Sequence, residues 1–162
     1  RGGDTVSVVT CRGGEMLAGA EGAFLRRLRG PRRSRAREDL ALPADAAEAG
    51  EAWAGRDVSM PGVAGSLLQL CESAGGLGIA LDVDALPVPV GIALEQWILA
   101  FPSYAFLLVG DPEALAARAG AAGLTCGRVG VLDDSGRLRL RAGDEEHLVW
   151  DLATEPLTGL SP

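Results

Sequence analysis

Apolar segments of two kinds succeed one another along this chain, and their order limits the folds open to it. Segments in which apolar residues alternate predict strands, whereas apolar residues three or four positions apart predict helices. The two kinds alternate through most of the chain, but strand-like segments follow one another directly at its end. This mixture predicts an α+β fold in which helices cover a mixed β-sheet, rather than a purely parallel sheet.

Six segments have the alternation or the short apolar run of a strand. In the first segment, Val6 and Val8 share one face, and Ser7 and Val9 share the other. The turn residues 134–136 predict that the fourth and fifth strands pair as a hairpin. The predicted strands are residues 4–11, 78–86, 104–109, 125–132, 137–141 and 146–152.

Five segments have helical spacing or helix-end signals. Ser59 is the predicted N-cap of the third helix, and Asp111 is the predicted N-cap of the fifth. Gly75 and Gly76 are expected to end the third helix. The predicted helices are residues 15–30, about 44–52 within a loop of 31–55, about 61–74, 92–101 and 111–123.

The length and charge of the chain exclude several functions. Its 162 residues fit one domain, residues 1–162, and its net charge is −7. Such an acidic chain argues against general binding to nucleic acid. The exception is an arginine cluster between Arg26 and Arg37, in which Arg32 and Arg33 could contact an anion. The alternative is that this cluster is a solvated loop.

Other features of the sequence suggest where the protein works. The three cysteines are far apart and lack metal-binding spacing, so we expect reduced thiols that pack in a cytoplasmic protein. No apolar run is long enough to cross a membrane. The absence of lysine suggests a bacterial coding bias. Because the chain does not begin with Met and opens close to a strand, we expect a domain of a longer protein.

The segment DVSMPGV, residues 57–63, carries the clearest chemical signal. A helix that begins near Pro61 directs free backbone N–H groups at whatever precedes it, and such a helix start can bind phosphate. Ser59 and Gly62 are the candidate phosphate contacts, and Asp57 is the candidate Mg²⁺ ligand. The alternative is that Ser59 only caps the helix and Asp57 only ends a loop.

Two other candidates have simpler alternatives. Asp82 and Asp84 could form a carboxylate pair for acid–base chemistry, or they could lie on the solvent face of a strand. His147 is the only histidine. Without a nucleophile pattern nearby, we interpret His147 as a structural residue.

Several motifs together resemble the C-terminal domain of the AIR synthase (PurM-like) superfamily. They are DVSMPGVAGSL followed by ESAGGLGIALDVDALP, then FPSYAFLLVGDPEALAARA, GRVGVL and the opening GGDTVSVV. The pattern is most similar to thiamine-monophosphate kinases and to uncharacterised AIR synthase-related members. The resemblance covers nearly the whole chain and implies the mixed α+β fold of that domain.

The resemblance also implies a site. Asp57 would bind Mg²⁺, Ser59 would contact the phosphates of ATP, and Ser103 and Tyr104 would face a small-molecule substrate. Met60 stands where the family has a second acid, and Pro102 and Ser103 stand where it has an acid pair. These departures imply a weaker metal site and a different substrate.

Two functions follow as hypotheses. In the first, the chain is the C-terminal domain of an ATP-dependent enzyme that phosphorylates or activates a small molecule. Because most ATP and Mg²⁺ ligands of the family lie on an N-terminal domain, we expect this chain to be inactive without that domain. The complete protein could form a homodimer. In the second, the chain is a binding module that keeps the fold without the chemistry.

Overall fold

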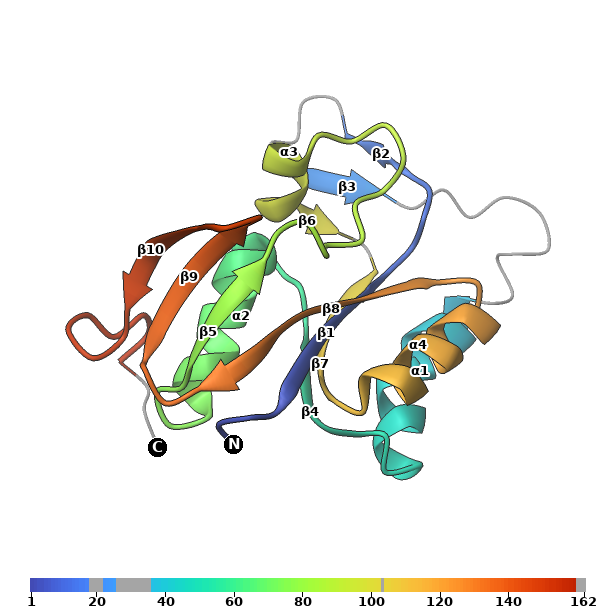
Figure 1. Cartoon of the computed structure of the whole chain (residues 1–162). Coiled ribbons are helices and arrows are strands. Elements are labelled where there is room, and N and C mark those ends of the chain that lie inside the picture. Colours follow the sequence, from blue (N-terminus) through green and yellow to red (C-terminus); the bar gives the residue numbers. More distant parts are fainter. Residues whose placement is uncertain (18–21, 26–35, 103, 160–162) are drawn as a thin grey trace.

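The structure is a computed structural model that describes residues 1–17, 22–25, 36–102 and 104–159. Helices and strands are interleaved along the chain, as the sequence predicts (Figure 1). Their bounds are β1 Thr5–Thr10, β2 Glu15–Met16, β3 Ala23–Leu25, α1 Ala36–Glu48, β4 Ala52–Asp57, α2 Gly62–Ser73, β5 Gly78–Asp82, α3 Leu94–Ile98, β6 Phe101–Pro102, β7 Ala105–Gly110, α4 Pro112–Ala121, β8 Thr125–Asp133, β9 Arg137–Ala142 and β10 Glu145–Asp151.

Two sheets organise the part of the chain that the structure describes. The large sheet has the strand order β10-β9-β5-β8-β1-β7-β4, and the small sheet has the order β2-β3-β6. In the large sheet β5 and β9 are parallel, and the other neighbours are antiparallel. The α+β fold with a mixed sheet is therefore confirmed.

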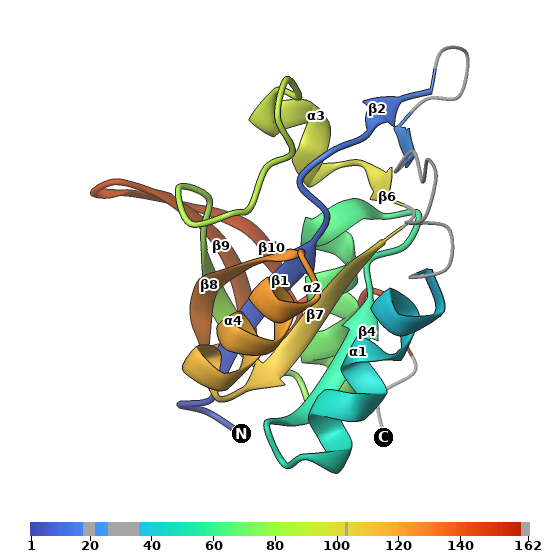
Figure 2. The ribbon, with the colours of Figure 1, turned by 90° about the vertical axis from the view of Figure 1, so that its right-hand side faces the viewer.

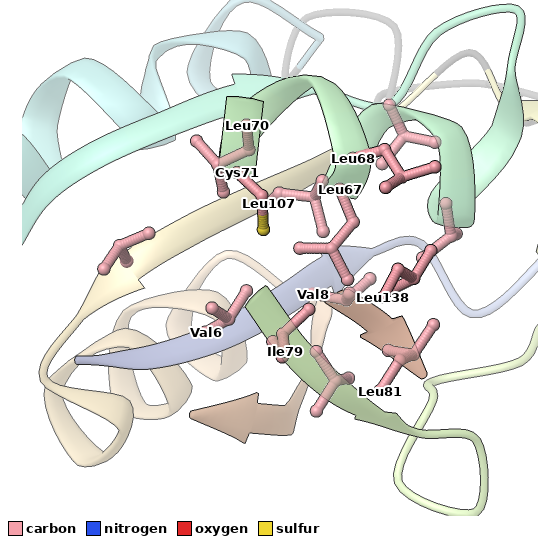
Figure 3. Close-up of a cluster of buried hydrophobic side chains, with 14 of the residues drawn as sticks. Val6, Val8, Leu67, Leu68, Leu70, Cys71, Ile79, Leu81, Leu107 and Leu138 are labelled. Atoms are coloured by element: carbon pink, nitrogen blue, oxygen red, sulfur yellow. The ribbon is translucent and has the colours of Figure 1, made fainter. Parts of the chain in front are cut away.

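Helices cover the two faces of the large sheet (Figure 2). α2 packs on one face, where Leu67 contributes to a buried cluster with Val8 and Leu107 (Figure 3). α1 and α4 cover the other face, where Val9 and Phe106 join a second cluster. β1 and β7 lie between these layers, so their side chains are buried on both faces.

Local sequence signals correctly predict the start of α4 and the end of α2. Asp111 caps α4, because its Oδ1 accepts hydrogen bonds from the backbone N–H of Glu113 at 2.9 Å and of Ala114 at 3.2 Å. Gly75 and Gly76 follow α2 with positive φ angles of 95° and 79°, as a helix end requires.

The prediction that the cysteines pack as reduced thiols agrees with the state of Cys71. Burial raises the pKa of the Cys71 thiol to about 12, which fits a packing residue.

The helix predicted at residues 15–30 is wrong. Within the described part of this range, β2 pairs with β3 in an antiparallel register. Gly22 adopts a φ of 75° just before β3. The aromatic ring of Phe24 packs edge-on against Trp97 with the ring centres 5.2 Å apart. Tertiary packing therefore overrides the four-residue apolar spacing.

Two further predictions are wrong. The range 31–55 contains the longer helix α1, with Pro43 inside it, and the first residues of the unpredicted strand β4. The hairpin expected at residues 134–136 does not form, because β5 lies between β8 and β9 in the sheet. Ile79 and Leu81 of β5 are fully buried in the α2-side cluster, and that burial favours a central position for β5.

None of the helices among the described residues is long and apolar enough to cross a membrane.

Candidate functional site

The start of α2 lies at the end of the β4–α2 connection. Pro61 is the N-cap, and no side chain caps the helix. The cap predicted for Ser59 is therefore wrong. Instead, the backbone N–H of Ser59 donates to the buried Ser66 hydroxyl at 3.1 Å, and the carbonyl of Ser59 accepts from the N–H of Gly62 at 2.9 Å. These bonds hold Ser59 in front of a helix with no acidic side chain in its first turn.

Gly62 is explained by a contact within the protein. Its φ is +69°, and a Cβ at this position would lie 2.5 Å from the carbonyl oxygen of Ile98 and 2.7 Å from the Cα of Leu99. Only glycine fits this conformation and this close approach. The glycine therefore lets α2 pack against the end of α3, and a phosphate contact by Gly62 stays a prediction.

The structure does not bring Asp57 to the start of α2. Asp57 is exposed and pairs across β4 and β7 with Phe106, which belongs to the cluster on the α1 side. Val58 belongs to the cluster on the α2 side. Because successive strand residues point to opposite faces, the Asp57 side chain lies on the face away from α2.

The other predicted site residues are only partly placed. Ser103, Arg32 and Arg33 lie outside the described residues. The N–H of Val58 donates to the carbonyl of Ala105 at 2.9 Å, so continuing the β4–β7 register brings Tyr104 level with Ser59. The carbonyl of Tyr104 accepts from the Thr10 hydroxyl at 3.0 Å, which fixes the backbone there.

Other charged candidates have structural partners. Asp82 accepts a hydrogen bond from Arg141 at 2.9 Å, and Asp84 accepts one from the backbone N–H of Gly143 at 2.9 Å. The exposed His147 lies 3.8 Å from the carboxylate of Glu145. These contacts favour structural functions. Across the described ranges, no group of three or more His, Cys, Asp or Glu side chains is placed to hold a metal.

Sequence reasoning missed a groove of about 450 Å³ between α1 and β4. Pro43, Ala44 and Ala47 of α1 line one side, and Phe106 and Leu108 of β7 are also part of its lining. The remaining lining comes from β4. The signal was weak, because the β4 segment AWAGRD has no apolar alternation and only its exposed tryptophan stands out.

Comparison with known proteins identifies the family to which this chain is similar. A family model described as "AIR synthase related protein, C-terminal domain" matches residues 26–143. The uncharacterized protein sll0787 of Synechocystis sp. is 40% identical over 111 residues, which are 67% of this chain and 34% of that protein. This chain thus spans about a third of the length of that curated relative.

Solved structures share the fold at low identity. PurL from Thermotoga maritima complexed with AMPPCP superimposes with a TM-score of 0.71 at 15% identity, over 96% of this chain and 26% of PurL. Hydrogenase maturation protein HypE gives a TM-score of 0.60 at 16% identity, over 97% of this chain and 55% of HypE. Together with the family match, these findings show that the chain belongs to the AIR synthase related protein family, as its C-terminal domain.

Proposed function

We propose that this domain supplies one side of a nucleotide site in an ATP-dependent enzyme, with its α2 start against the phosphates. The observation that carries the proposal is the uncapped start of α2, because its first-turn N–H groups have no side-chain acceptor. The partial positive charge of a helix start favours an anion there. PurL structures complexed with ATP and with ADP share this fold, which supports a nucleotide as the anion.

Ser59 and Tyr104 are the residues that would flank this anion. Ser59 is half-buried and is held by Ser66, so its position is fixed before any ligand arrives. Tyr104 directly precedes β7, and continuing the β4–β7 register brings it level with Ser59. We assign Ser59 to the phosphate and Tyr104, with Ser103, to the substrate side. Arg32 and Arg33 stay candidate anion contacts.

The described residues do not make a magnesium site by themselves. Mg²⁺ requires several oxygen ligands in octahedral geometry. Asp57 is a single carboxylate on the face away from α2. A metal ligand function for Asp57 therefore needs further ligands from a partner domain.

The proposed reaction is phosphorylation or ATP-driven activation of a small molecule. Such reactions depend on groups that surround the phosphates on several sides. This domain offers one such side, so we propose that it works with a nucleotide-binding domain and forms a homodimer in the complete protein. The lengths of PurL and HypE beyond the matched part are consistent with a partner domain.

Calorimetric titration with ATP and Mg²⁺ tests this function. We expect saturable binding by the protein in which this domain is joined to its nucleotide-binding domain, and none by the 162-residue chain alone. Equal binding by both proteins would contradict a shared site. Failure of the complete protein to bind would contradict a nucleotide function.

A second function is a binding module without catalysis. The observation that favours it is Met60, whose side chain is 79% exposed in the connection that leads into α2, where the family pattern has an acid. An exposed methionine contributes to protein contacts rather than to metal binding. Titration of the complete protein and of its nucleotide-binding domain alone separates the two functions, because a binding module would leave the affinity of that domain for ATP unchanged.

A further inference from the structure

β4 forms a free edge of the large sheet. It pairs with β7 on one side, and no described strand pairs with its other side. Trp53, Ala54 and Gly55, in the middle of the strand, are exposed. An edge strand carries backbone N–H and C=O groups that another strand can pair with. β4 has neither lysine nor proline, the residues that often block such pairing.

The groove between α1 and β4 lies directly beside this edge. Ala44 and Ala47 have small side chains, so the α1 wall projects little into the groove. Gly55 adds no side chain to the β4 wall of the groove. A Cβ at this position would lie 2.8 Å from the Leu108 side chain, which also lines the groove. Trp53 is also among the lining residues, but the N–H of its exposed indole donates to Asp4 at 3.0 Å, so the indole is turned toward the segment before β1. The result is an apolar channel that follows a strand edge.

Asp57 places a negative charge at one end of this channel. Its side chain lies on the groove face of β4, because Asp57 and Phe106 are paired and Phe106 lines the groove. Within the described ranges, the Asp57 carboxylate has no hydrogen bond or ion pair. Arg56 is also among the lining residues, but it pairs with Leu107 of the α2-side cluster, so its side chain points to the opposite face of the sheet. The channel is thus complementary to an apolar segment with a cation at one end.

We propose that β4 binds an extended segment of a partner protein, which adds to the large sheet as an eighth strand. Alternate side chains of the segment enter the groove, because residues two positions apart share a face of a strand. A basic side chain on the same face pairs with Asp57. This surface is separate from the start of α2, so the inference does not depend on the proposed nucleotide function.

A second copy of this chain fits the edge less well. Directly opposed residues of two paired strands point to the same face of the sheet. The only base in β4 is Arg56, and it lies on the face opposite to Asp57. Pairing of two β4 strands therefore leaves Asp57 without a cation. A different polypeptide with its own basic residue is the occupant that the charges favour.

The test is binding of the fluorescein-labelled peptide RTVTVTR, whose arginines and valines share one face of a strand. Fluorescence anisotropy with the 162-residue chain, without ATP or Mg²⁺, should show saturable binding. Ala47→Trp fills the groove from the exposed side of α1 and should weaken binding by about tenfold or more. Ala116→Trp, on an exposed position of α4 outside the groove lining, is the matched control and should leave binding unchanged.

Three further measurements identify the binding mode. The peptide QTVTVTQ should bind about threefold to tenfold more weakly than RTVTVTR to the unmodified chain, and equally to Asp57→Asn. The peptide RTPPVTR should lose binding, because proline cannot donate to a strand ladder and one of two successive N–H groups must face β4. Backbone amides of β4 should gain protection from hydrogen exchange, whereas those of the other edge, β10, should not.

Several results would overturn the inference. They are the absence of saturable binding, equal loss of binding in Ala47→Trp and Ala116→Trp, and full binding of the proline peptide. A concentration-dependent dimer in light scattering that Ala47→Trp abolishes would assign the edge to a second copy and would also overturn it. Because nucleotide is absent, none of these results bears on ATP binding.

Discussion

At the scale of single residues, Gly62 shows how tightly the start of α2 is defined. Its backbone has a left-handed φ of +69°, and its missing Cβ leaves room for the backbone of Ile98 and Leu99. The first condition restricts the residue type, and the second fixes the distance between α2 and α3. The position of the helix start therefore depends on a contact between elements that are far apart in the sequence.

Replacement of Gly62 by alanine tests whether a backbone clash adds to the strain of the left-handed φ. We expect Gly62→Ala to lower the free energy of unfolding by about 3 kcal/mol or more, because strain and a backbone clash add. Gly91 is the matched control, since its φ is +81° and a Cβ at this position would have no neighbouring atom within 4 Å. Gly91→Ala should cost about 1–2 kcal/mol. Equal losses in urea denaturation would contradict the packing of α3 on Gly62.

Predictions made from single residues are correct where the residue acts within one helix. Asp111 caps α4 as predicted, because a cap needs only the next three residues. Ser59 does not cap α2, because Ser66 and the α3 contact at Gly62 set the path of the chain. The position of Asp57 relative to α2 also depends on the register of β4, which the sequence did not reveal.

At the scale of elements, the C-terminal segment after β10 is attached to α2 through one carboxylate. Glu72, in the last turn of α2, is buried and accepts hydrogen bonds from the backbone N–H of Thr158 at 3.1 Å and from its hydroxyl at 2.5 Å. Leu152 and Leu157 of this segment pack on the cluster beneath α2. The hydrogen bond from the Thr158 hydroxyl is the main cause that lowers the pKa of Glu72.

This attachment should make stability depend on pH. Because the pKa of Glu72 is lower in the folded state, its contribution is present above the ordinary value of 4.5 and is lost as the pH falls through the lowered value. Glu72→Gln should therefore lower the thermal midpoint at pH 7, and the difference from the unmodified chain should shrink toward pH 3. The exposed Glu48→Gln controls for loss of charge. A difference that does not change with pH would contradict this function of Glu72.

Sequence patterns identified elements whose burial is simple and missed those set by tertiary contacts. The buried runs that became β1, β5 and β7 were predicted because their apolar residues are continuous or alternate. β4 was missed because an edge strand with one exposed side needs few apolar residues. The hairpin after β8 was wrongly predicted because a turn signal does not show that β5 lies between the two strands.

At the scale of the whole molecule, the large sheet separates two surfaces. α2 begins on one side of it, where the helix start is uncapped, and the groove beside α1 lies on the other side. The proposed nucleotide contact and the proposed strand addition therefore occupy different faces. The fold class could be predicted because a mixed order of strands and helices has few layered solutions. The separation of the two surfaces required the strand register.

The most direct measurement is the affinity for ATP of a matched pair of variants at the helix start, in the protein joined to its nucleotide-binding domain. Pro61 is exposed at the N-cap of α2, so Pro61→Asp and Pro61→Asn introduce the same cap with and without a charge. If phosphate lies against α2, Pro61→Asp should bind ATP about tenfold more weakly than Pro61→Asn, because two negative charges then share the helix start. The aspartate variant should be at least as stable to heat. Equal affinities for ATP would contradict a phosphate contact at α2.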